Sequence, residues 1–133
     1  MTKELATKSA EAMGYKSGVT IALDVSDLQR SIAWYRDVLG FKVQYVLPEL
    51  GWCELETATK DTTIGLSEVQ EVKLGNCTPV FAVADIEKAR EHLEAHQVRF
   101  DGPTREVGGM VKLATFYDPD GNSYMLSQSL PQQ

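Results

Sequence analysis

The chain has 133 residues and a mass of 14.7 kDa, the size of one compact domain or of two very small units. Its 13 Lys and Arg against 19 Asp and Glu give a formal net charge of -6, which excludes the basic surface that nucleic acids or anionic membranes require. Hydrophobic residues at 43% and charged residues at 24% exclude a disordered, collagen-like or coiled-coil chain. We therefore expect a globular protein whose partners include neither nucleic acid nor membrane.

The start of the chain predicts no targeting segment. Residues 1–18 are polar, and no later stretch is apolar for long enough to span a membrane. We expect a cytoplasmic protein. Cys53 and Cys77 are too few for a disulfide framework and have neither a CxxC spacing nor a nearby His, so we expect two small, mostly buried apolar side chains.

Two segments of the sequence follow the same plan, shifted by 58 residues (83 − 25 = 58). Residues 19–25 alternate apolar and polar side chains as a half-buried strand does, and a helical pattern over 27–39 follows at once. Residues 79–83 and 86–96 repeat this strand and this helix. The apolar face of the first helix consists of Leu28, Ile32, Tyr35 and Leu39.

Helix starts and turns are marked by short polar motifs. Ser26 with Gln29 three residues later forms a capping-box pattern and predicts Ser26 as an N-cap, and Asp85 lies in the N-cap region of the second copy. The pair Gly108-Gly109 suits a tight hairpin, and residues 118–121 (DPDG) are a strong turn signal.

Further strands follow each helix. They are predicted at 41–47, 52–57 and 62–69 in the first copy, and at 98–101, 105–107, 111–117 and 123–127 in the second. A short linker over 70–76 separates the copies. The prediction is an N-terminal arm over 1–16 and a single α+β domain over 17–133, built from two βαβββ modules at about 17–69 and 77–129.

One helix per module covers only one face of its strands, so the other face must curl around a cavity or pack on a partner. Strand parity places small or mildly polar side chains on that face: Thr20, Ala22, Asp24, Trp52, Glu54, Thr63, Gly65, Ser67, Thr78, Val80, Ala82, Ser123, Met125 and Ser127. Such a set suits a cavity lining, with a solvated sheet face as the alternative. Within it, Trp52 offers a surface on which a ligand can stack.

Three stretches, VSDLQRSIAWYRDVLGFKV (25–43), VADIEKAREHLEAHQV (83–98) and FYDPDGNSYML (116–126), resemble the vicinal oxygen chelate superfamily. That group includes glyoxalase I, extradiol dioxygenases and the bleomycin-resistance proteins, and the resemblance spans residues 17–129. It implies paired βαβββ modules that form a cupped mixed sheet. It also implies a homodimer whose subunits complete the cavities, although the chemistry has to be argued from the site itself.

Enzymes of this family hold a divalent metal through side chains at four strand positions. The resemblance places these positions at Thr20, Gly65, Thr78 and Met125. Thr hydroxyls are weak neutral donors, Gly has no side chain, and the Met thioether prefers soft metals. We therefore expect neither the family's metal centre nor another cofactor.

Other groups of residues are weaker candidates for a functional site. His92 and His96 have the i, i+4 spacing of a metal clamp but no carboxylate or cysteine partner, so we expect a solvated helix face. The acidic residues at 118–121 lack the later ligands of a calcium loop and are expected to form a hairpin turn. Asp24 and Glu54 are either wet rim charges or, if one is buried with a raised pKa, a general base.

The leading hypothesis is a metal-free binding protein that sequesters a drug or an aromatic or cationic metabolite, as bleomycin-resistance proteins do. Its ligand-binding residues are predicted to be Thr20, Asp24, Trp52, Glu54, Gly65, Thr78 and Met125. One alternative is a metal-dependent lyase, isomerase or dioxygenase of the glyoxalase type with an atypical site, for which no catalytic residue is assigned. The other is a non-catalytic interaction module.

Overall fold

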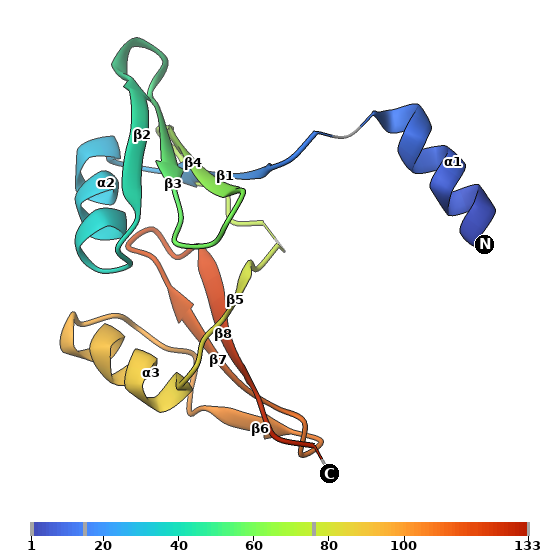
Figure 1. Cartoon of the computed structure of the whole chain (residues 1–133). Coiled ribbons are helices and arrows are strands. Elements are labelled where there is room, and N and C mark those ends of the chain that lie inside the picture. The colour runs from blue at the N-terminus through green and yellow to red at the C-terminus, as the bar shows by residue number, and fades with distance from the viewer. Residues whose placement is uncertain (1, 15, 76, 133) are drawn as a thin grey trace.

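The computed structural model describes residues 2–14, 16–75 and 77–132 and shows two modules connected end to end (Figure 1). In chain order the elements are α1 (Lys3–Met13), β1 (Val19–Val25), α2 (Leu28–Asp37), β2 (Lys42–Leu47), the 3-10 turn η1 (Pro48–Leu50), β3 (Trp52–Glu56), β4 (Thr62–Glu68), β5 (Val80–Ala82), α3 (Ile86–Ala95), β6 (Arg105–Val107), β7 (Val111–Tyr117) and β8 (Ser123–Ser129). None of the helices in these described ranges is both long and apolar enough to cross a membrane.

The predicted pair of βαβββ modules is confirmed. The strands form two four-stranded sheets, which we call sheet A (order β1-β4-β3-β2) and sheet B (order β5-β8-β7-β6). In each sheet the first strand of the module is parallel to the last strand, and the other neighbours are antiparallel. The strand expected at 98–101 is reduced to a single bridge between Phe100 and Phe116. Asn76, at the end of the predicted linker, lies outside the described residues.

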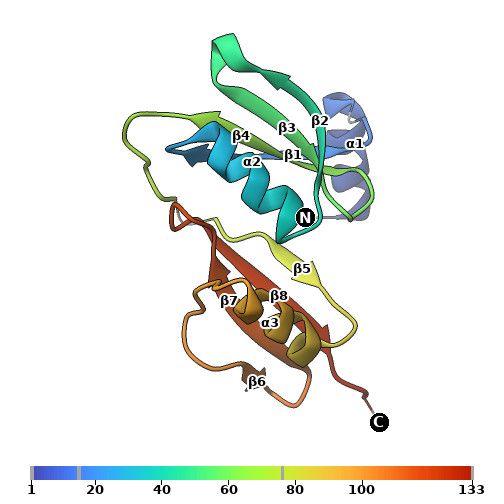
Figure 2. The same ribbon diagram turned by 90° about the vertical axis from the view of Figure 1, so that its left-hand side faces the viewer.

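The helices α2 and α3 lie on the same side of the two sheets (Figures 1 and 2). Each packs its apolar face on the sheet of its own module, because Leu28, Ile32 and Tyr35 of α2 and Ile86 and Leu93 of α3 are buried. Neither helix covers the opposite face of sheet A or sheet B. We call these opposite faces the free faces.

The start of α2 differs from the prediction. The N-cap is Asp27, whose carboxylate accepts a hydrogen bond from the Arg30 backbone N–H at 3.0 Å. The predicted cap, Ser26, instead donates from its hydroxyl to Asp120 Oδ1 at 2.6 Å. The prediction of Ser26 was wrong because a partner 94 residues away in the sequence holds its side chain. In the second module Asp85 is the N-cap, as expected.

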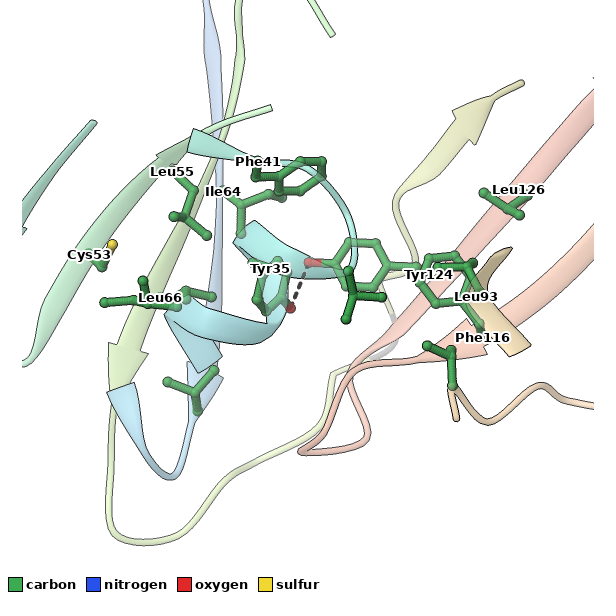
Figure 3. Packing of buried hydrophobic residues seen from close by; sticks show 14 of the residues in the cluster. Tyr35, Phe41, Cys53, Leu55, Ile64, Leu66, Leu93, Phe116, Tyr124 and Leu126 are labelled. Carbon is green, nitrogen blue, oxygen red and sulfur yellow. Dashed lines mark hydrogen bonds between the residues drawn. The ribbon is translucent and has the colours of Figure 1, made fainter. Parts of the chain in front are cut away.

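Aromatic side chains join the two modules into one core. Tyr35 of α2 meets Tyr124 of β8 with ring centroids 6.1 Å apart (Figure 3). Phe41 meets Phe81 with ring centroids 6.0 Å apart. Such aromatic pairs add stabilisation beyond the apolar area that they bury. The modules therefore share a core and do not stand as independent units.

A buried polar cluster lies at the same junction. Asp118, only 4% exposed, accepts hydrogen bonds from the Tyr35 hydroxyl at 2.7 Å, the Asn122 amide at 2.8 Å, and the backbone N–H groups of Asp120 and Asn122 at 2.9 and 2.8 Å. The hydroxyls of Tyr35 and Tyr124 lie 3.0 Å apart (Figure 3). Burial raises the pKa of both tyrosines, so both stay neutral hydrogen-bonding groups. The DPDG turn thus also fastens sheet B to α2.

One hairpin agrees with the prediction from the sequence, whereas one of the two cysteines does not. The hairpin between β6 and β7 turns at Gly108 and Gly109, which both have positive φ, as expected. Of the two cysteines, Cys53 is buried as predicted, whereas Cys77 is exposed, so that part of the prediction was wrong.

Candidate functional site

The free face of sheet A brings together most of the residues that strand parity selected. Thr20 on β1 pairs with Thr63 on β4, and Glu54 on β3 pairs with Gly65 on β4. Paired residues point to the same face of a sheet, so these side chains and Trp52, two residues before Glu54, share one surface.

Glu54 is the centre of this surface. It is only 7% exposed, and its carboxylate accepts four hydrogen bonds. The donors are the Thr63 hydroxyl at 2.6 Å, the Thr20 hydroxyl at 2.9 Å, the Trp52 indole N–H at 3.1 Å and the Tyr45 hydroxyl at 3.4 Å. Burial alone raises the pKa of Glu54, but these hydrogen bonds outweigh burial and the pKa lies below its usual value. Glu54 is therefore a fixed negative charge at neutral pH. Neither alternative for this residue is met, because Glu54 is buried and so is not a wet rim charge, and its pKa is lowered and not raised as in a general base.

The Trp52 indole lies against the backbone of Gly65. A Cβ added at Gly65 would overlap the six-membered ring of the indole. Trp52 remains half-exposed, while its N–H is held by Glu54. The glycine therefore sets the position of the indole on the free face.

Substitution of Gly65 by Ala should displace this indole. We expect a loss of about 1 kcal/mol in the free energy of unfolding, because overpacking is costly but a half-exposed ring can swing away. Tryptophan emission should also shift to longer wavelength as the Trp52 indole becomes more exposed to solvent. Gly75→Ala is the matched control, because a methyl group there meets no atom closer than 4.0 Å. Identical emission spectra for the two variants would contradict the contact.

Of the remaining predicted residues, Asp24 shares the free face of sheet A, because it pairs with Ser67 as Trp52 does, whereas Thr78 and Met125 belong to the second module. The Thr78 hydroxyl pairs with the Ser123 hydroxyl at 2.6 Å, and Met125 pairs with Val80, both on sheet B. Asp24 lies at the end of β1, half-buried, where it accepts a 3.4 Å hydrogen bond from the Lys73 backbone. No hydrogen bond between described residues joins the Glu54 group to Thr78 or Met125. Within one chain the predicted site is therefore split between the two sheets.

A large hollow lies on the other side of the sheets, where α2 and α3 pack. Its volume is about 760 Å³, and it opens between α2, β5 and α3, lined mostly by apolar side chains that include Leu39, Phe41, Phe81 and Ala89. His92 lines it as well, with Nε2 at 2.9 Å from the Val38 carbonyl oxygen. None of the seven predicted ligand-binding residues takes part. A smaller hollow of about 210 Å³ between β1 and β8 includes Asp24.

The four positions of the family's metal ligands do not fit a divalent ion. The Thr20 and Thr78 hydroxyls are engaged with Glu54 and Ser123, Gly65 is covered by Trp52, and Met125 offers only a thioether. Across residues 2–14, 16–75 and 77–132, no three His, Cys, Asp or Glu side chains are grouped as a metal would need. His92 and His96 have ring centroids 4.7 Å apart but no third ligand.

Tyr45 is the residue of this site that sequence reasoning missed. The ladder between β2 and β3 shifts register between Val43 and Tyr45. Val43 pairs with Leu55 on the core face, whereas Tyr45 pairs with Glu54 on the free face. Strict alternation from Val43 places Tyr45 in the core, so no local signal revealed it.

Known structures share this fold. A superfamily member from Sphaerobacter thermophilus superposes with a TM-score of 0.74 at 20% identity, covering 86% of this chain and 98% of that one. TnmS3, an antibiotic binding protein from a Streptomyces species, gives 0.69 at 23% identity, with 88% and 98% coverage. A Nocardioides structure described as a glyoxalase/bleomycin resistance protein/dioxygenase gives 0.67 at 19% identity, with 100% and 99% coverage, a match that includes α1.

A comparison with curated proteins finds no match to this sequence. The identities to the three structures are below 25%, so these structures support the fold and nothing finer. A family model covers most of the chain. The model for the Glyoxalase/Bleomycin resistance protein/Dioxygenase superfamily matches residues 19–126, and the chain belongs to this superfamily.

Proposed function

We propose that this protein binds a planar aromatic cation without a metal ion and thereby sequesters it. The observation that carries the proposal is the half-exposed Trp52 indole beside the ionised Glu54 on a sheet face that no helix covers. An indole attracts aromatic cations through stacking and through its quadrupole. A buried carboxylate with a lowered pKa adds a negative charge that acts over a short range.

The chemistry of Glu54 favours binding over catalysis. All four donors around the carboxylate belong to the protein, so its lone pairs are already used. A carboxylate held in this way is a poor acceptor of a substrate proton. It therefore serves as a fixed counter-charge for a bound cation.

The ligand-binding cup, in this proposal, is completed by a second copy of the chain. Sheet A carries Thr20, Asp24, Trp52, Glu54 and Gly65, while Met125 lies on sheet B and Thr78 lies two residues before its strand β5. The free face of sheet B is more apolar, since Val80, Val107, Val111, Leu113 and Met125 share it by register. A homodimer that places sheet A of one copy opposite sheet B of the other encloses a ligand between a charged wall and an apolar wall. TnmS3, which shares this fold, is itself an antibiotic binding protein.

Trp52→Ala should weaken the binding of such a ligand about tenfold, because a stacking contact contributes on the order of 1–2 kcal/mol. Acridine orange, a planar aromatic cation, is a suitable probe, and its fluorescence anisotropy can be followed as EDTA-dialysed protein is added. Fluorescein, a planar anion, should bind much more weakly.

Trp34→Ala is the matched control for this measurement. Trp34 belongs to α2 and packs edge-on against Tyr35, so its loss leaves the free face intact. Equal affinities of the two alanine variants for acridine orange would refute the role of Trp52. Binding that appears only after a divalent metal is added back would refute the metal-free proposal.

A further inference from the structure

The free face of sheet A carries a second carboxylate besides that of Glu54. Asp24 on β1 and Trp52 on β3 both pair with Ser67 on β4, so these residues form one row across the face. Glu54 lies in the neighbouring row, where it pairs with Gly65. From the spacing of strands and the rise along a strand, the Cα atoms of Asp24 and Glu54 lie about 12 Å apart. The Trp52 indole extends over Gly65 and therefore runs between the two carboxylates.

A small hollow adjoins the indole on the side of Asp24. It is the hollow of about 210 Å³ between β1 and β8, which we call the Asp24 hollow, and Ala22 and Asp24 belong to its wall. Ala22 pairs with Gly65, over which the indole lies. Gly65 and Ser67, the free-face residues of β4 between the indole and β1, are both small. A molecule stacked on the indole can therefore extend into the hollow without meeting a large side chain of sheet A.

The Asp24 carboxylate is available to a ligand, unlike that of Glu54. Its side chain is half-buried, and among the described residues it accepts one hydrogen bond, at 3.4 Å from the Lys73 backbone N–H. Lys73 also lines the hollow, but its ammonium group forms no ion pair with Asp24 or with any other described residue. The carboxylate therefore keeps free lone pairs, and a cationic donor makes the strongest hydrogen bond to such an acceptor.

The polar side chains on the β8 side of the hollow are already engaged. The Asn122 amide donates to the Asp24 backbone carbonyl at 2.9 Å and to Asp118 at 2.8 Å. The Ser123 hydroxyl pairs with the Thr78 hydroxyl at 2.6 Å. Asp24 is the only acidic side chain among the described residues that line the hollow. A ligand group that enters the hollow is therefore selected by the Asp24 carboxylate.

We propose that the ligand is a dication, whose aromatic ring stacks on Trp52 beside Glu54 and whose short arm places a second positive charge against Asp24. This inference rests on the proposed function and narrows its ligand class. The arm has to span little more than one strand spacing, about 5 Å, because Ala22 in the wall of the hollow neighbours Gly65 beneath the indole.

Three acridine compounds test the second charge on the wild-type protein. Aminoacridine has the cationic ring and no arm. A second compound carries a dimethylaminopropyl arm on the same amino group, and a third carries an uncharged branched alkyl arm of the same shape. Their dissociation constants are measured by fluorescence titration with EDTA-dialysed protein. We expect the charged arm to bind at least fivefold more tightly than the uncharged arm, because it alone forms a charged hydrogen bond. Equal affinities of the two armed compounds would overturn the dication.

Asp24→Asn tests which group holds the second charge. The amide keeps the shape of the side chain and removes its charge, so the affinity for the charged-arm compound should fall at least fivefold. Aminoacridine affinity should change less than twofold, which also reports that the variant is folded. Glu56→Gln is the matched control, because Glu56 is on the same face, where it pairs with Thr63, but does not line the hollow. It should change both affinities less than twofold.

The outcomes separate this inference from the proposed function. An equal loss of charged-arm binding in Asp24→Asn and Glu56→Gln would overturn Asp24 as the partner of the second charge. Aminoacridine binding without any gain from the charged arm would overturn the dication and leave the aromatic-cation site standing. If none of the three compounds binds the wild-type protein, the proposed function and the dication fail together.

Discussion

Asp118→Ala is expected to lower the free energy of unfolding by about 3 kcal/mol, one of the largest effects of any substitution outside the apolar core. Asp118 is buried and accepts hydrogen bonds from a tyrosine, an amide side chain and two backbone N–H groups. Loss of the acceptor leaves these buried donors unsatisfied, and each costs on the order of 1 kcal/mol or more. Urea unfolding at one fixed protein concentration measures the change.

Loss of the Tyr35 hydroxyl, which donates to Asp118 at the junction between the modules, should also lower the free energy of unfolding. Tyr35→Phe removes only the donor at 2.7 Å from Asp118 and is expected to cost about 1–2 kcal/mol. Asp101→Ala is the matched control, because Asp101 is exposed and such surface changes usually lie within about 0.5 kcal/mol of zero. If Asp118→Ala unfolds at the same urea concentration as Asp101→Ala, the cluster does not fasten the modules.

The architecture could be predicted from the sequence because its signals are local. Apolar residues at helical spacing fixed the buried face of α2, where Leu28, Ile32 and Tyr35 are all buried. Local sequence signals also predicted the turn at Gly108-Gly109 and the N-cap Asp85 correctly. Each of these features depends on a few neighbouring residues, whose preferences agree with the final fold.

Features that depend on distant partners could not be predicted. Ser26 has a capping-box sequence, yet Asp120 takes its hydroxyl. The register shift before Tyr45 reverses its face, and only the structure shows that Tyr45 reaches Glu54. Strand parity told which side chains share a face, but not that Thr20 and Met125 lie on two separate sheets. The helix α1 was expected only as an arm, although Thr2 and Gly14, its caps, are residue types that mark helix ends in a sequence.

Glu54→Gln should produce the second large effect, on ligand binding and on acid stability together. The amide keeps the shape but removes the charge, and its NH₂ group cannot accept the hydrogen bonds that the hydroxyl and indole donors make. We expect acridine orange to bind at least tenfold more weakly and the free energy of unfolding at neutral pH to fall by about 1–2 kcal/mol. Glu56→Gln is the control, because Glu56 is exposed, two residues further along the same strand and on the same face.

The pH dependence distinguishes a buried charge from a merely buried polar group. The folded pKa of Glu54 lies below the ordinary value of a glutamate, since its hydrogen bonds outweigh burial. The stability that the ionised group contributes is therefore fully present above the unfolded pKa and is lost as the pH falls through the folded pKa. Wild type and Glu54→Gln should differ by a constant amount near neutral pH, and the difference should shrink below about pH 4. A difference that stays constant down to pH 3 would show that the pKa of Glu54 is the same in the folded and the unfolded protein, so that its hydrogen bonds do not stabilise the charged form.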